Sequence, residues 1–136
     1  MISIRPMTHD DIPDVVALSH RVYGPTAWRA SDLESHLKLF PEGQLVAINK
    51  AGPRSKTGEL VGSAASLIVK WADYDFTTTE YEITGLGRFE NHNPEAGRTL
   101  YGADVCVHAD RRRMGIGKKI YAARRKLCRD LGLVRI

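Results

Sequence analysis

Residues 107–126, "VHADRRRMGIGKKIYAARRK", join the end of an apolar strand to a strongly basic helix. Three consecutive arginines, and two glycines that flank one isoleucine, form the turn between the two elements. Apolar residues then recur at spacings of three and four, which predicts a helix from about 115 to 131 with an inner face of Ile116, Ile120, Ala123, Leu127 and Leu131. Because open α/β sheets bind ligands where a strand gives way to a helix, the stretch predicts both a fold class and the place of a site.

The turn itself has the chemistry of an anion site. The first N–H groups of a helix have no partner inside the helix, and about half a positive charge collects there, so the backbone can hold a phosphate. Gly115 and Gly117 carry no side chain that would block the approach. Arg112 offers a planar cation that can bond two oxygens at once. Together these features predict a binding site for a pyrophosphate.

Three phosphate-binding patterns compete for this turn. A Walker loop needs Gly-Lys-Ser/Thr, but Gly117 is followed by two lysines and no hydroxyl. A dinucleotide fingerprint needs a third glycine where Ile120 stands, and it follows the first strand of its fold. The remaining pattern, Arg/Gln-x-x-Gly-x-Gly/Ala after a strand, is met at every fixed position by "RRMGIG" (112–117).

The charge of the 136-residue chain is unevenly distributed. Residues 1–110 carry 10 Lys/Arg and 15 Asp/Glu, a net charge of −5, whereas residues 111–136 carry 10 Lys/Arg and one acidic residue, a net charge of +9. A local excess of this kind indicates a defined anionic partner, either a nucleic acid or a phosphorylated small molecule. With 43% hydrophobic residues, the length fits one domain over residues 1–136.

Targeting and redox features point to a cytoplasmic protein. Cys106 and Cys128 are too few for a disulfide framework, and the N-terminus "MISIRPMTHDD" lacks the pattern of a signal peptide. The longest charge-free stretch is far shorter than the roughly 20 residues that span a bilayer, so no membrane partner is expected. No metal site is expected either, because no spacing typical of metal ligands links the cysteines to His9, His20, His36 and His92.

The first half of the chain has an alternating plan of strands and helices. Turn residues and apolar patterning predict a strand at 2–6, a helix from near Thr8 or Asp10 to Gly24, a helix at 32–40, and a hairpin of strands at 44–50 and 59–71 around "AGPRSKTG" (51–58).

The second half begins with a polar stretch, residues 72–98, that is longer than an ordinary connection. Thr77 and Glu80 stand at capping-box spacing there, which predicts a short helix near 78–84. A strand at 99–108 follows, apolar enough at its end to be buried on both faces like a central parallel strand. After the basic helix, "LVRI" (133–136) is expected to begin another strand.

With these segments identified, the sequence resembles the GNAT superfamily of acyl-CoA N-acyltransferases. The resemblance rests on "IRPMTHDDIPDVVAL", "LVGSAASLIV" and "VCVHADRRRMGIGKKIYAARRKL". More narrowly, "FPEGQLVA", "YEITGLG" and the segment from Leu100 to Leu133 are similar to the GNAT module ahead of a carbon–nitrogen hydrolase domain in some two-domain bacterial proteins. The family implies an α/β fold with a mixed central sheet flanked by helices, in the order β-α-α-β-β-β-α-β.

The resemblance also implies acetyl-CoA as the cosubstrate. In similar proteins the diphosphate lies on the arginine–glycine loop and the pantetheine arm pairs with the preceding strand. Family enzymes commonly have a proline where Ala109 stands, a departure that removes no ligand group. Carried over to this sequence, the expected cofactor-binding residues are Val105, Cys106, Val107, Arg112, Arg113, Met114, Gly115, Ile116, Gly117 and Lys118.

The family's chemistry is acyl transfer to a primary amine, of a small molecule or a protein, and it needs a base. A lysine-like amine of pKa about 10.4 is neutral in roughly one molecule in 2,500 at pH 7, a deficit near 4.6 kcal/mol. The candidate bases are Asp104, on the strand beside the expected thioester, and Glu80 and Glu82, in the polar segment. For Asp104 the alternative is a hydrogen-bonded strand residue, and for the glutamates a helix cap and an exposed side chain.

Two functions of other classes stay open at this point. One is a CoA-binding or structural module without catalysis. The other is nucleic-acid binding by the basic helix, which is disfavoured because Tyr121 is its one aromatic residue. GNAT-like folds also continue past the strand at 133 into a helix and two strands, so we expect this domain to be C-terminally incomplete, or a homodimer to complete its open sheet edge.

Overall fold

A four-stranded antiparallel sheet forms the centre of the computed structural model, which describes residues 1–50, 58–75 and 77–136. Each strand pairs with its neighbour in the chain, in the order β1-β2-β3-β4. The strands are β1 (Ile2–Pro6), β2 (Leu45–Asn49), β3 (Glu59–Val69) and β4 (Thr99–Val107). The expected hairpin is therefore confirmed, while its turn at 51–57 lies outside the described residues.

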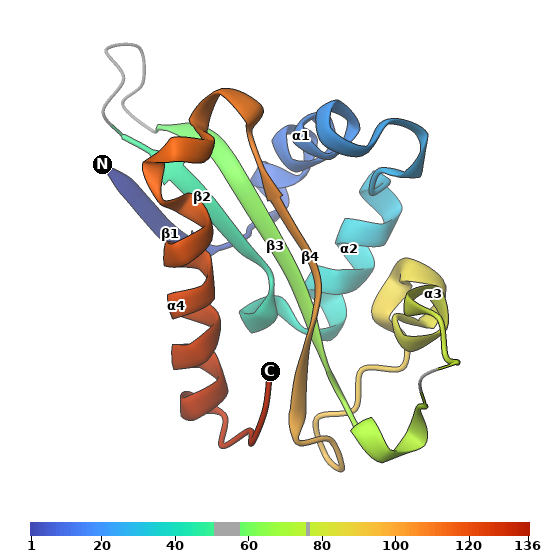
Figure 1. Cartoon of the computed structure of the whole chain (residues 1–136). Helices are drawn as coiled ribbons and strands as arrows, with labels where there is room; N and C mark the ends of the chain where they lie inside the picture. The colour runs from blue at the N-terminus through green and yellow to red at the C-terminus, as the bar shows by residue number, and fades with distance from the viewer. Residues whose placement is uncertain (51–57, 76) are drawn as a thin grey trace.

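Helices cover both faces of the sheet, as Figure 1 shows. The helices α1 (Ile12–Tyr23) and α2 (Ala30–Leu39) lie on one face, and α4 (Ile116–Asp130) lies on the other. Each helix buries an apolar stripe against the strands. Val15 and Leu33 pack with Val46 on the first face, and Ile116 and Ile120 pack with Val61 on the second. The predicted helix at 115–131 is confirmed, but Leu131, expected on its inner face, follows the last helical residue and is 42% exposed.

The polar stretch after β3 contains the short helix α3 (Glu80–Ile83), followed by the turn η5 (Gly85–Phe89). Its capping box is formed by Thr79 and Glu82, two residues later than the pair expected from spacing. The turn has left-handed backbone at Leu86 (φ 61°) and Gly87 (φ 84°), and it buries Phe89 fully. The stretch thus packs against the sheet instead of forming a bare connection.

Two details of β4 differ from expectation. The strand is antiparallel to β3 and lies at the edge of the sheet, so its apolar end is not that of a central parallel strand. The apolar end of the strand is explained by Val105 and Val107, which pack against the apolar cluster beneath α4. The expected strand at 133–136 is reduced to one parallel bridge between Thr99 and Arg135 at the base of β4.

A β-bulge interrupts the pairing of β4 with β3. Ala65 pairs with Asp104 but Ser66 pairs with Gly102, so Ala103 is the extra residue. Bulges bend a strand and change the direction in which neighbouring side chains point. This one stands at the middle of the edge strand, beside the residue expected to act as the base.

Candidate active site

Two cavities lie along the edge of β4 and share one residue, Tyr23, at the end of α1. The first cavity has a volume of about 460 Å³ and brings together residues from α1, β4, the arginine–glycine turn and α4. Its lining consists of Val22, Tyr23, Val105, Val107, Arg112 and Gly117. Four of the predicted cofactor residues therefore meet at one cavity.

The N-terminus of α4 lies at this first cavity, and no side chain caps it. Gly115 turns the chain into the helix with a left-handed backbone (φ 73°), which a side chain would strain. A Cβ atom built on Gly117 would meet nothing within 4 Å, so the space in front of the first helical N–H groups is open. The backbone here is arranged to receive an anion.

The arginines of the turn have different surroundings. Arg111 forms an ion pair of 3.4 Å with Glu59, whereas Arg112 is exposed and lines the cavity. The turn itself is a 3-10 helix, η6 (Ala109–Met114), and the Asp110 backbone N–H donates to His108 Nδ1 at 3.2 Å. His108 thus caps the turn. Ala109, the first residue of the turn, stands where members of the family commonly have a proline.

The other predicted cofactor residues lie on β4 and around the turn in different surroundings. Ile116 is fully buried in the core and can present its backbone alone, and the Cys106 side chain is buried toward the Leu18 carbonyl, with burial raising its pKa to about 12. Met114 and Lys118 are exposed beside the turn, and Arg113 belongs to η6.

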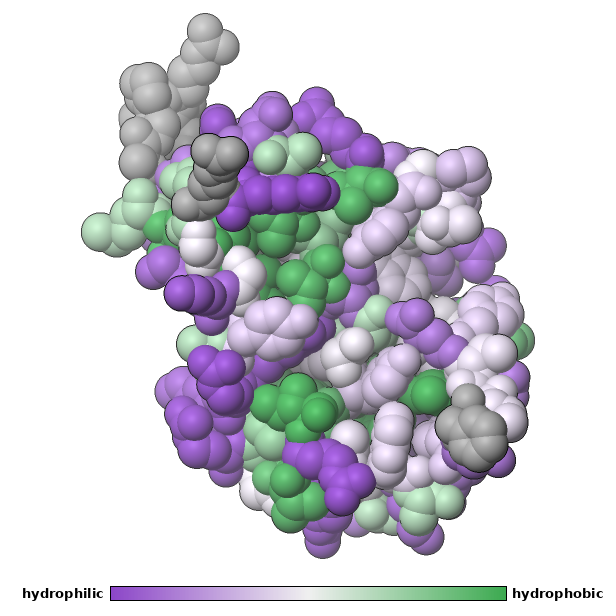
Figure 2. Space-filling view, in the orientation of Figure 1, coloured by the Kyte–Doolittle hydropathy of each residue, from purple (hydrophilic) through white to green (hydrophobic). Residues whose placement is uncertain are grey.

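The second cavity, of about 600 Å³, lies between the α1–α2 connection, α3, η5 and β4. It joins segments from four parts of the chain, and aromatic and acidic side chains line much of it. Its walls include Tyr23, Trp28, Arg29, Asp32, Glu80, Tyr81, Thr84, Leu86, Gly87 and Asp104. In Figure 2 deep purple hydrophilic surface lies over α4, at the left of the view, and paler surface lies over α3, at the right.

Asp104 lines the second cavity, half-buried beside the bulge. Its Oδ1 accepts a hydrogen bond of 2.7 Å from the Tyr23 hydroxyl, and its Oδ2 accepts one of 3.0 Å from Trp28 Nε1. Burial raises the pKa of this carboxyl, and the two hydrogen bonds oppose that rise. A carboxylate fixed in this way can still accept a hydrogen bond from another donor, since each oxygen has two lone pairs.

The two glutamates that sequence analysis grouped together occupy different positions. Glu80 is exposed and lines the second cavity. Glu82 accepts a hydrogen bond of 3.0 Å from the Thr79 hydroxyl in the capping box of α3, and it does not line the cavity.

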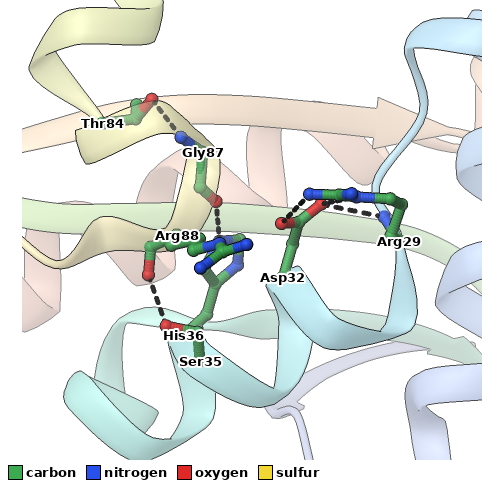
Figure 3. A network of polar contacts seen from close by, with 7 residues as sticks. All are labelled: Arg29, Asp32, Ser35, His36, Thr84, Gly87 and Arg88. Carbon is green, nitrogen blue, oxygen red and sulfur yellow. Dashed lines mark hydrogen bonds and ion pairs between the residues drawn. The ribbon is translucent and has the colours of Figure 1, made fainter.

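A set of polar contacts attaches η5 to α2 and thereby fixes one wall of the second cavity (Figure 3). His36 Nε2 donates to the Gly87 carbonyl at 2.7 Å, and the Ser35 hydroxyl donates to the Arg88 carbonyl at 2.7 Å. The His36 ring stacks on Phe89 with 3.6 Å between ring centroids. His36 is fully buried, and burial lowers its pKa to about 4, so the ring is neutral at pH 7.

One basic residue of α4 points inward. Arg124 is 2% exposed, and its Nη2 donates to the carbonyls of Ala65 (2.8 Å) and Asp104 (2.7 Å) at the bulge. The guanidinium thus satisfies carbonyl groups beside the irregularity and fixes the backbone of the Asp104 strand. This role was missed from the sequence, although Arg124 stands four residues after Ile120 and three before Leu127, a spacing that places it on the inner face of the helix.

Residues 17–136 match the model of the Acetyltransferase (GNAT) family. The chain belongs to the GNAT family. The match confirms the resemblance that the arginine–glycine turn predicted, and family membership supports acyl transfer as the class of activity. Neighbouring GNAT structures bind CoA or acyl-CoA.

Two Bacillus subtilis (strain 168) proteins are GNAT relatives of this chain. The protein named "Probable hydrolase YhcX" is 39% identical over 131 residues, which cover 96% of this chain and 24% of YhcX. The protein named "Uncharacterized N-acetyltransferase YkwB" is 32% identical over 140 residues, which cover 99% of this chain and 58% of YkwB. The chain thus spans about a quarter of one relative and just over half of the other. The match to a hydrolase-named protein agrees with the narrower resemblance to a GNAT module joined to a hydrolase domain.

The GNAT fold is also found in a solved structure of low sequence identity. The loading GNATL domain of CurA from Lyngbya majuscula has a TM-score of 0.69 at 15% identity, with 90% of this chain and 55% of that one covered. This likeness concerns the fold. In the described ranges of this chain, no helix is long and apolar enough to cross a membrane.

Proposed function

We propose that this GNAT domain binds acetyl-CoA in the first cavity and transfers the acetyl group to a primary amine held in the second. The observation that supports this most strongly is the meeting of the two cavities at Tyr23. The anion-binding turn lies on one side of that residue, and the Asp104 carboxylate lies on the other. A thioester at the junction would face an amine that enters from the opposite cavity.

Asp104 is the base in this proposal. It accepts a proton from the ammonium form of the acceptor, and the neutral nitrogen attacks the thioester carbonyl. The C–N bond forms and the C–S bond breaks. The leaving thiolate takes up the second proton that the attacking nitrogen loses, which gives the neutral amide and free CoA, and Asp104 releases its proton to water. Tyr23 and Trp28 position the carboxylate, since both donate to it. Tyr23 stays protonated at neutral pH, because burial, and then Asp104, raise the pKa of its hydroxyl.

The test is release of free CoA from acetyl-CoA in the presence of amines, with the acetylated amine identified by mass spectrometry. Asp104→Asn should lower kcat by about 100-fold, the usual contribution of a general base, and leave the Kd for acetyl-CoA within twofold. For the parent chain, kcat/KM should rise with pH through the raised pKa of Asp104, and the variant should lack that rise. Acetyl-CoA that is bound but stays intact with every amine would instead favour a CoA-binding module.

A further inference from the structure

The second cavity has an unbalanced set of charges. Asp32 is offset by Arg29, whose Nη2 lies 3.3 Å from Asp32 Oδ1. Asp104 and Glu80 remain, and among the described residues neither forms an ion pair within 4.0 Å. Three carboxylates and one arginine therefore line the cavity, while Arg124, behind the bulge, offsets part of the charge of Asp104. The lining has an excess of negative charge, in contrast to the basic turn beside the first cavity.

The two unpaired carboxylates stand in different parts of one cavity. Asp104 lies on β4 beside the bulge, half-buried, whereas Glu80 begins α3 and is exposed. Glu80 adds, after burial, Asp104 and Cys106, to the rise in the pKa of the Tyr23 hydroxyl, and both residues line the cavity. Negative potential thus extends from α3 to the bulge.

Aromatic rings line the space between these carboxylates. Tyr23, Trp28 and Tyr81 all line the cavity, and Trp28 and Tyr23 use their polar atoms on Asp104. Their ring faces can contact an aliphatic chain or attract an ammonium group. A cavity of about 600 Å³ has room for a small acceptor with several methylene groups.

We propose that the acceptor is a dicationic amine, a linear diamine or a longer polyamine, with the reacting nitrogen at Asp104 and the second ammonium group at Glu80. This inference rests on the proposed function, because it names the substrate class of the same cavity. An acceptor that carries a carboxylate in place of the second ammonium group would meet Glu80 and be repelled. Arg29 does not reverse this selection, because its charge is engaged by Asp32.

The experiment compares three ligands with the same four-carbon chain: butylamine, 1,4-diaminobutane and 4-aminobutanoate. Their Kd values are measured by calorimetry on the full chain in the presence of unacylated CoA, so the readout does not depend on turnover. We expect 1,4-diaminobutane to bind about tenfold more tightly than butylamine, and 4-aminobutanoate to bind more weakly than either. Equal affinities for the diamine and the monoamine would overturn the proposal.

Glu80→Gln keeps the size of the side chain and removes its charge. It should reduce the preference for the diamine to within twofold, because the second ammonium group then has no carboxylate partner. Glu34→Gln is the matched control, because Glu34 is exposed on α2 and does not line the cavity. A tenfold preference that survives Glu80→Gln would show that the second ammonium group binds elsewhere.

The same ligands then serve as acceptors with acetyl-CoA. Diamine selectivity in binding without any acetylated product would retain the dicationic ligand and reject the proposed acetyl transfer. Acetylation of amines with no advantage for the diamine would retain acetyl transfer and reject the dicationic acceptor. The two proposals therefore fail separately.

Discussion

The two cavities along β4 are built in opposite ways. The first takes its anion-binding parts from a single run of residues, 105–117, in which a strand, a turn and a helix follow one another. The second takes its walls from α1, α2, α3, η5 and β4, and no two adjacent elements complete it. A basic turn and the open N-terminus of α4 lie at the first, whereas carboxylates and aromatic side chains line the second.

The two cavities differ in what fixes the position of their binding groups. Backbone N–H groups at the end of a helix are fixed by local geometry, so a short motif suffices to place them. Side chains from distant segments converge by packing alone, so their position depends on the whole fold. Under the proposed function, changes to the first cavity should therefore act on CoA binding directly, and changes to the second should act on the binding of the amine.

The largest effect is expected from Gly117→Val. The fold leaves open space at this position, so the new side chain should not disturb the helix, yet it would occupy the space in front of the N–H groups. Binding of acetyl-CoA should fall more than 100-fold while the Tm changes little. Calorimetry and thermal unfolding on the same samples measure both.

Lys118→Ala is the comparison for this variant. Lys118 is an exposed point charge that its neighbour Lys119 can partly replace, so its loss should weaken binding by less than Gly117→Val does. If Gly117→Val binds CoA normally and Lys118→Ala does not, the phosphates contact side chains and the backbone cradle is wrong.

A smaller effect is expected from Arg112→Ala. Arg112 lines the first cavity, and a charge-assisted pair of hydrogen bonds to the diphosphate contributes about 1.5–3 kcal/mol, so CoA binding should weaken at least tenfold. Arg125→Ala is the matched control, because Arg125 is an exposed arginine of α4 that does not line the cavity. Equal losses in both variants would mean that Arg112 supplies general charge instead of a specific contact.

The contrast between the cavities also explains what could be predicted from the sequence. The spacing of apolar residues predicted α4, capping and stop residues predicted α1 and α2, and a turn rich in glycine and proline between two apolar runs predicted the hairpin. The arginine–glycine turn predicted the first cavity, again from a local pattern. The expected strand at 133–136 was wrong beyond the bridge at Arg135, because four residues give a pattern but not the partner that would pair with them.

The second cavity was predicted in part. Asp104 and Glu80 were named because carboxylates are natural bases, yet Tyr23 and Trp28, which hold Asp104, carry no motif. Trp28 is 76 residues from Asp104 in the chain, and only the packing of the α1–α2 connection on the edge strand brings the two together. Glu82 belongs to the same helix as Glu80, but it accepts a hydrogen bond from Thr79 in the capping box. Composition alone does not show which of the two glutamates takes part in the capping box.

The smallest effect, and the one that tests the wall of the second cavity, is expected from His36→Leu. The leucine cannot donate to the Gly87 carbonyl, so η5 loses its contact with α2 and the free energy of unfolding should fall by about 1–3 kcal/mol. Because Gly87 and Leu86 line the cavity, the KM for the amine should rise up to about tenfold while the Kd for acetyl-CoA stays unchanged. His36→Gln, which keeps an N–H donor at a similar reach, should restore most of the KM. If both variants raise KM equally, the ring stack on Phe89 positions the wall and the hydrogen bond does not.

The stability of the parent chain should depend on pH through His36, and the stability of His36→Leu should not. The folded-state pKa of about 4 lies below the value of about 6.5 expected in the unfolded chain, so the unfolded state binds the proton first. The contribution of this residue is therefore fully present above pH 6.5 and is lost as the pH falls toward 4. His36→Leu lacks the titrating group, so its stability deficit relative to the parent should shrink over that range. Denaturant unfolding of both proteins at pH 7, 5.5 and 4.5 measures the difference, and a deficit that stays constant would place the proton elsewhere in the wall.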